Sequence, residues 1–301
     1  MQRLIGCGLL ALAWGMAQAQ TTVPEKSITP DVPTAEQIEK AEARRQPARE
    51  YGRLDYKVDP EAYSIVSSVR GLSTHKSTFV YPLTYSPDYN DRQSELVLQI
   101  SAKQRLFGTN AYLAYTQKSF WQLLNSEDSS RFRETNYDAE IFYRWIPDDP
   151  KPLNHWGADL GFEHESNGRE VPHSRSWNRV YLGAFHPKGR HLAYLKFWYR
   201  IPEKNKAVET DPRGDDNPDI NRFMGYSELS YSRQIQAKQL LTGMVRGNLE
   251  THKGAVSFTW SMPSSEGYVF YGVSVFHGYG ESLSLFDKSV TRVMLGVLLA
   301  R

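Results

Sequence analysis

From about Ser77 onward, apolar and polar residues alternate in segments of about ten residues, separated by polar links. Alternation with a period of two gives a β-strand one apolar and one polar face. We expect strands near residues 77–86, 94–104, 110–121, 134–146, 154–165, 176–186, 190–201, 222–233, 237–247, 253–262, 266–277 and 290–300. No run of eighteen apolar residues follows residue 19, so no transmembrane helix is predicted. A closed barrel is the other structure that satisfies backbone hydrogen bonds inside a membrane.

The number of strands and the character of the links between them specify the kind of barrel. The expected strands number twelve, and bacterial outer-membrane barrels have an even number. The sequence therefore predicts an all-β fold, a 12-stranded antiparallel transmembrane β-barrel of the bacterial outer-membrane type. The links at 122–133, 166–175, 202–221 and 278–289 are long and polar, whereas several of the others are short. Because such barrels have long outer loops and short periplasmic turns, we expect these four links on the outer side.

The average composition is compatible with this prediction. The mean hydropathy of -0.56 is that of a soluble protein, but a barrel alternates lipid-facing and lumen-facing residues and so hides its hydrophobicity from averages. Aromatic residues make up 13% of the chain, with 18 Tyr and 7 Trp, which suits the girdles at membrane interfaces. A formal net charge of +2 is too balanced to indicate nucleic acid as a partner.

The N-terminal region is expected to contain an export signal and an extension. Residues 1–19 combine a basic start, an apolar run and a small-residue ending, which is typical of a cleaved signal peptide. The lone cysteine, Cys7, lies in this segment, so no disulfide is expected in the mature chain. Residues 20–70 are rich in Pro, charge and small polar residues, and we interpret them as a periplasmic extension or linker. Residues 71–301 would then form the barrel.

The segment GFEHESNGREVPHSRSWNR at 161–179 contains three polar residues that could act together. His164 and Ser166 continue the apolar face of one expected strand, and Asn178 continues the apolar face of the next. A histidine can act as general base for a serine nucleophile, and an asparagine oxygen can hold the imidazole in the required tautomer. The spacing indicates a possible hydrolase site on the outside of the barrel, near the lipid boundary.

Four sequence blocks resemble one known family. They are YTQKSFWQLLNSEDSSRFRETNY at 115–137, HESNGREVPHSRSWNR at 164–179, DDNPDI at 215–220 and GYGESL at 278–283. In this order they are similar to the outer membrane phospholipase A family. The resemblance implies a calcium-dependent phospholipase of the bacterial outer membrane, with phospholipids as substrate, A1 and A2 activity, and a catalytic site that faces the outer leaflet. It also implies that His164, Ser166 and Asn178 are the catalytic residues.

The resemblance further implies an active homodimer with Ca²⁺ bound between the two barrels. The matching ligands are the Ser129 backbone oxygen of one subunit and, from the other, the Arg169 backbone oxygen and the Ser174 hydroxyl. Hard cations such as Ca²⁺ prefer oxygen ligands. Asp216 matches an aspartate that helps to bind calcium in the monomer, but Val171 stands where some relatives have a second aspartate.

Two other functions are compatible with the pattern of residues. The chain could be a non-enzymatic channel or structural barrel, although a porin would be wider and would have a charged constriction. It could also be an acyltransferase that passes the acyl group to an acceptor other than water, because both reactions proceed through an acyl-enzyme. Neither the preference between the two ester positions nor the range of head groups follows from the sequence.

Overall fold

The computed structural model describes residues 72–88, 94–148, 154–265, 267 and 269–301. The chain divides into two compact units, residues 1–46 and 47–301, and all described residues belong to the second. The expected signal peptide and extension therefore lie outside the described residues. Among the helices of the described ranges, none is long and apolar enough to cross a membrane.

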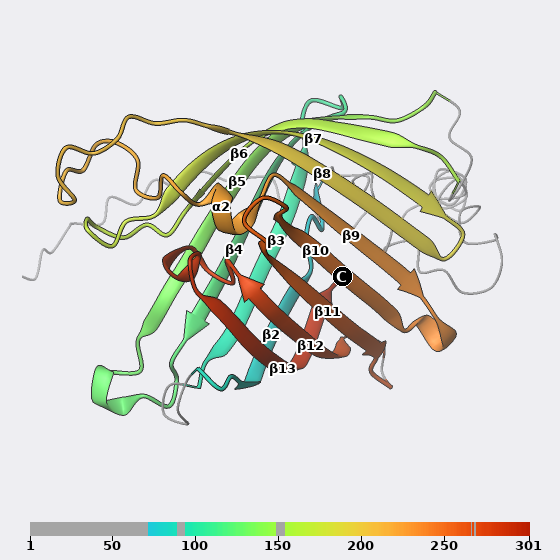
Figure 1. The fold of residues 1–301 in the computed structure, drawn as a ribbon. Helices are drawn as coiled ribbons and strands as arrows, with labels where there is room; N and C mark the ends of the chain where they lie inside the picture. Colours follow the sequence, from blue (N-terminus) through green and yellow to red (C-terminus); the bar gives the residue numbers. More distant parts are fainter. Residues whose placement is uncertain (1–71, 89–93, 149–153, 266, 268) are drawn as a thin grey trace, which may run out of the picture. The chain divides into compact units, whose positions relative to one another are not determined.

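Strands dominate the described part of the chain (Figure 1). They are β1 (Leu72–Ser73), β2 (Thr78–Tyr85), β3 (Leu96–Arg105), β4 (Ala111–Trp121), β5 (Phe132–Trp145), β6 (Gly157–Ser166), β7 (Ser176–Lys188), β8 (His191–Ile201), β9 (Ser227–Gln234), β10 (Leu240–Asn248), β11 (Lys253–Pro263), β12 (Phe270–Tyr279) and β13 (Ser289–Ala300). The helical elements are short: η2 (Ser126–Asp128), α2 (Asn221–Met224), η3 (Gln236–Lys238) and η4 (Leu283–Leu285).

The strands β2 to β13 form a closed ring. Each pairs antiparallel with its neighbours in the chain, β13 pairs with β2, and β3 pairs with both β2 and β4. The two-residue strand β1 adds to β3. This confirms the predicted twelve-stranded antiparallel barrel. Because alternate links emerge at the same edge of an antiparallel sheet, the links after β4, β6, β8 and β12 lie together at one edge of the barrel.

One predicted strand is wrong at its N-terminal end. The segment expected to begin a strand at residue 222 forms the single turn of α2, and β9 starts only at Ser227. Phe223 and Met224 are buried in an aromatic cluster at this point. Gly225 has a φ of 74°, and a Cβ there would lie 1.9 Å from the Gly247 carbonyl oxygen. Tertiary packing and a glycine-dependent turn thus override the alternating pattern.

The two faces of each strand meet different surroundings. On β6, Leu160 and Phe162 are 60% and 38% exposed, whereas Asp159 and Glu163 are each 1% exposed. Apolar side chains therefore face outward and charged ones face the lumen, the reverse of a soluble protein. Buried aromatic residues such as Trp177 help to fill the lumen, and a cavity of about 570 Å³ remains there.

Candidate active site

His164 and Asn178 are direct neighbours across the pairing of β6 and β7. The His164 Nδ1 atom lies 2.9 Å from the Asn178 Oδ1 atom, at hydrogen-bond distance. Both side chains are half-buried. An amide oxygen only accepts hydrogen bonds, so the His164 Nδ1 carries the hydrogen and donates it. In this neutral tautomer the Nε2 atom keeps its lone pair and can accept a proton.

Ser166 ends β6, two residues after His164 and on the same face of the strand. It is half-buried, and its register partner on β7 is Ser176. Among the hydrogen bonds of the described residues, none joins the Ser166 hydroxyl to the His164 ring. In a free enzyme such bonds are often long and tighten only when substrate binds.

The three residues extend the apolar outer surface of the barrel. Val180 and Leu182 follow Asn178 on the outer face of β7 and are 41% and 56% exposed. Leu160 and Phe162 precede His164 on the outer face of β6. The structure therefore places His164, Ser166 and Asn178 on the side that would face lipid, where an acyl chain could approach them without entering the lumen.

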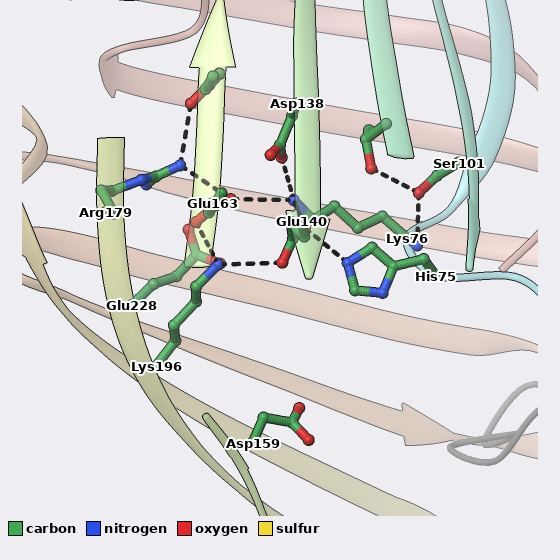
Figure 2. A network of polar contacts seen from close by, with 12 residues as sticks. His75, Lys76, Ser101, Asp138, Glu140, Asp159, Glu163, Arg179, Lys196 and Glu228 are labelled. Carbon is green, nitrogen blue, oxygen red and sulfur yellow. Dashed lines mark hydrogen bonds and ion pairs between the residues drawn. The ribbon is translucent and has the colours of Figure 1, made fainter. Parts of the chain in front are cut away.

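The lumenal face behind this site carries a network of charges (Figure 2). Glu163 pairs in register with Arg179, and the Arg179 guanidinium lies 2.9 Å from a Glu163 oxygen. The Lys196 ammonium lies 2.7 Å from the other Glu163 oxygen. Lys76 lies in the segment between β1 and β2, and its ammonium donates to an Asp138 carboxylate oxygen at 2.6 Å. These pairs connect β6, β7 and β8 just behind the outward residues, and they join β5 to the segment between β1 and β2.

The network includes a group of carboxylates, on Asp138, Glu140 and Glu163, whose oxygens lie within 4.8 Å of one another. The Lys76 ammonium is 3.0 Å from Glu140 and 3.7 Å from Glu163, so a lysine balances part of this charge. None of these carboxylates was among the predicted calcium ligands, which lie in the links at the barrel edge.

The predicted calcium ligands are partly brought together. The Ser174 hydroxyl donates to Asp216 at 2.6 Å, so a hydroxyl and a carboxylate from two different links adjoin. The Asp216 carboxylate is also paired with the Lys206 ammonium. Ser129 follows η2, and among the described residues no hydrogen bond joins it to Arg169, Ser174 or Asp216. The predicted metal ligands are all oxygen atoms and fit a hard cation. In this structure, the Lys206 ammonium is paired with the Asp216 carboxylate.

Two residues that shape this region did not stand out in the sequence. The buried Asn167 side chain accepts hydrogen bonds from the backbone of Arg169 and Arg175, at 3.3 and 2.9 Å, and so closes the link between β6 and β7. Glu203, just beyond β8, accepts a hydrogen bond from the Asn178 amide at 3.1 Å. An asparagine before a glycine suggests a turn, but no local pattern announces the contact of Glu203.

The comparisons with known proteins agree with this architecture. A family model described as phospholipase A1 matches residues 60–299. The phospholipase A1 of Salmonella typhimurium is 36% identical over 225 residues, which cover 72% of this chain and 73% of the relative. The Salmonella typhi outer membrane phospholipase, solved as a dimer with bound calcium, superposes with a TM-score of 0.65 at 32% identity, covering 77% of this chain and 98% of that one.

A second similar structure is an active-site mutant of outer membrane phospholipase A from Escherichia coli, which carries an asparagine-to-alanine substitution. It superposes with a TM-score of 0.66 at 32% identity and covers 77% of this chain and 93% of its own. The match of the family model, the identity to curated relatives and the shared barrel all agree. The chain belongs to the phospholipase A1 family, and it is a phospholipase built as a β-barrel of the bacterial outer membrane.

Proposed function

We propose that this phospholipase hydrolyses acyl ester bonds of phospholipids and lysophospholipids, with A1 and A2 activity, by a Ser-His-Asn mechanism that depends on calcium and on homodimer formation. The observation that carries the proposal is the 2.9 Å contact between His164 Nδ1 and Asn178 Oδ1 on the outward face of the barrel, two residues from Ser166. An imidazole held in this way presents Nε2 toward a serine nucleophile.

In the first half-reaction, the Ser166 hydroxyl oxygen attacks the ester carbonyl and its proton passes to His164 Nε2. The tetrahedral intermediate collapses, the ester C–O bond breaks, and His164 returns the proton to the departing lysophospholipid oxygen. An acyl-enzyme remains on Ser166. Asn178 keeps the ring oriented throughout, although a neutral amide stabilises imidazolium less than a carboxylate does.

In the second half-reaction, His164 removes a proton from water, and the resulting hydroxide attacks the acyl-enzyme. The Ser166 oxygen leaves as the fatty acid is released, and His164 returns the proton to Ser166. Hydrolysis, rather than transfer to another acceptor, requires that water reaches the site, and His164 and Ser166 are half-exposed at the barrel edge. No feature of the described residues specifically favours the acyltransferase alternative.

Calcium would be held by oxygen atoms of Ser129 from one subunit and of Arg169 and Ser174 from the other. When bound, it would supply positive charge close to the oxyanion that develops during ester attack. This proposal is supported by the neighbouring Ser174 hydroxyl and Asp216 carboxylate and by the calcium-bound dimer of the Salmonella typhi enzyme. A site completed by a partner subunit would restrain an enzyme that is embedded in its own substrate.

The proposed orientation places the links after β4, β6, β8 and β12 outside the cell, so that the site meets the outer leaflet. The same proposal assigns residues 1–19 to a signal peptide and residues 20–70 to a periplasmic extension. Orientation can be measured by adding protease or a membrane-impermeant cysteine label to whole cells that carry a single cysteine in the link at 202–221.

The test is fatty acid release from mixed phospholipid micelles by the refolded protein, with Ca²⁺ or with excess EDTA. We expect calcium-dependent release, and a loss of at least about 10³-fold in Ser166→Ala, because the nucleophile is absent. Ser289→Ala is the matched control, since it removes an exposed serine from the end of another strand at the same edge. Release by Ser166→Ala at the rate of the unchanged protein would refute the assigned nucleophile.

A further inference from the structure

The Asn178 side chain has hydrogen-bond partners on both of its ends. Its Oδ1 atom lies 2.9 Å from His164 Nδ1, and its Nδ2 atom donates to the Glu203 Oε1 atom at 3.1 Å. The three side chains therefore form a continuous chain of hydrogen bonds from the histidine to a carboxylate. All three are half-buried, and they come from β6, from β7 and from the link after β8.

An asparagine can serve as the third member only in one of its two orientations. Rotation by 180° about the last side-chain bond exchanges the amide oxygen and nitrogen, which would turn an N–H donor toward His164. That orientation favours the tautomer whose proton lies on Nε2, and such a histidine cannot accept the Ser166 proton. An aspartate would not have this problem, because its two oxygens are equivalent.

Glu203 resolves the choice of orientation. A carboxylate oxygen accepts hydrogen bonds and has none to donate, so the Asn178 amide must turn its nitrogen toward Glu203. The amide oxygen is then left facing His164. The bond is also charge-assisted, and such bonds are stronger than those between neutral groups.

The fold places Glu203 at this amide for a reason visible in the sheet. Ile201, the last residue of β8, is the register partner of Asn178. Glu203 follows two residues later, after Pro202. Among the ion pairs of the described residues, none includes Glu203, whereas the nearby Asp215 and Asp216 pair with Arg200 and Lys206. Among the described residues, the hydrogen bond that the Glu203 carboxylate accepts comes from Asn178.

We propose that Glu203 is a positioning residue of the hydrolytic site, which fixes the Asn178 amide so that its oxygen accepts from His164. The inference rests on the proposed Ser-His-Asn mechanism and extends it to a fourth side chain. Glu203 does not contact the reacting atoms and acts through Asn178 alone. The effect of removing it should therefore vanish once Asn178 is gone.

The experiment measures kcat and KM for phospholipid hydrolysis by the refolded full chain in mixed micelles. We expect Glu203→Ala to lower kcat about tenfold, as for the loss of one charge-assisted hydrogen bond, with KM changed less than about twofold. Glu203→Gln keeps an acceptor for the Asn178 amide and should retain kcat within about threefold. Glu209→Ala removes an exposed glutamate of the same link and should leave kcat unchanged.

The decisive comparison is the double variant Asn178→Ala with Glu203→Ala. The effects of substitutions in one hydrogen-bond network are not additive. The double variant should therefore be no slower than Asn178→Ala alone. A further tenfold loss in the double variant, or equal losses in Glu203→Gln and Glu203→Ala, would overturn the inference. Full activity of Glu203→Ala would also overturn it, while inactivity of Ser166→Ala in the same assay would leave the proposed mechanism standing. An active Ser166→Ala would instead refute the mechanism itself.

Discussion

The two faces of β6 and β7 carry polar pairs of opposite character, although the pairs are adjacent in sequence. On the lumenal face, Glu163 and Arg179 are buried, charged and bonded to each other and to further partners. On the outer face, His164 and Asn178 are half-buried and joined to each other by one contact, and Asn178 donates one further hydrogen bond, to Glu203. The lumenal pair holds strands together through charge, whereas the outer pair is neutral and leaves the His164 Nε2 atom unoccupied by Asn178.

This contrast shows how a barrel can hold a candidate site on its lipid-facing side. Successive side chains of a strand point to opposite faces, so the position of His164 is set by whatever fixes Glu163. A shift of register by one residue would move the charges to the lipid and the site into the lumen. The buried ion pairs therefore make the register, and with it the site, costly to disturb.

The largest expected effect is a loss of stability when a charged residue of the lumenal face is replaced. Glu163→Gln leaves Arg179 and Lys196 buried without their shared carboxylate, so we expect a loss of about 3 kcal/mol in the free energy of unfolding. Urea unfolding in detergent or bilayers measures this. The double variant with Lys196→Gln should lose less than the sum of the two single variants, because both charges are removed. An unchanged unfolding free energy in Glu163→Gln would mean that the network does not hold β6 in place.

The next largest effect is a loss of turnover, with little loss of stability, when a residue of the outer face is replaced. Asn178→Ala should lower turnover by about 10²-fold, because the imidazole loses its orienting acceptor, while residual hydrolysis persists. The unfolding free energy should change by less than about 2 kcal/mol, because the half-exposed Asn178 side chain loses one neutral bond, to His164, and one charge-assisted bond, to Glu203. Turnover by Asn178→Ala that matches the unchanged protein would show that another group orients His164.

The smallest effect concerns the ion pair of Lys206 with Asp216 at the barrel edge. Lys206→Met removes a cation from the carboxylate predicted to help bind calcium, so calcium affinity should rise about threefold. Isothermal titration with Ca²⁺ measures the affinity, and Lys204→Met is the matched control because that side chain is exposed in the same link. Equal affinities in the two variants would mean that Lys206 does not compete with calcium.

The fold was largely predictable because the alternation of apolar and polar residues in each strand shows which side chains face outward and which face the lumen. Leu160 and Phe162 are apolar because they face outward, and Glu163 is charged because it faces the lumen. The pattern failed at residues 222–226, where Phe223 and Met224 are buried by packing against distant strands and Gly225 turns the backbone. Alternation reports a local period and carries no information about such contacts.

The candidate site divides in the same way. His164, Ser166 and Asn178 could be proposed from their spacing and from the resemblance to a known family, because each lies on the apolar face of an expected strand. The calcium ligands rested on the resemblance alone. Glu203, Asn167 and Lys206 could not be assigned, because their partners lie in other links or strands and no periodicity connects them.

The sequence by itself determined the number of strands, their faces and the residues proposed to perform ester hydrolysis, since these depend on the local alternation of side chains and on residue chemistry. Only the tertiary structure decided which charges balance one another inside the barrel, that Lys206 pairs with Asp216, and that Glu203 holds the Asn178 amide. The physical reason is that hydrogen bonds and ion pairs form between residues that strand pairing and loop closure bring together, and this proximity is a property of the closed ring rather than of any segment.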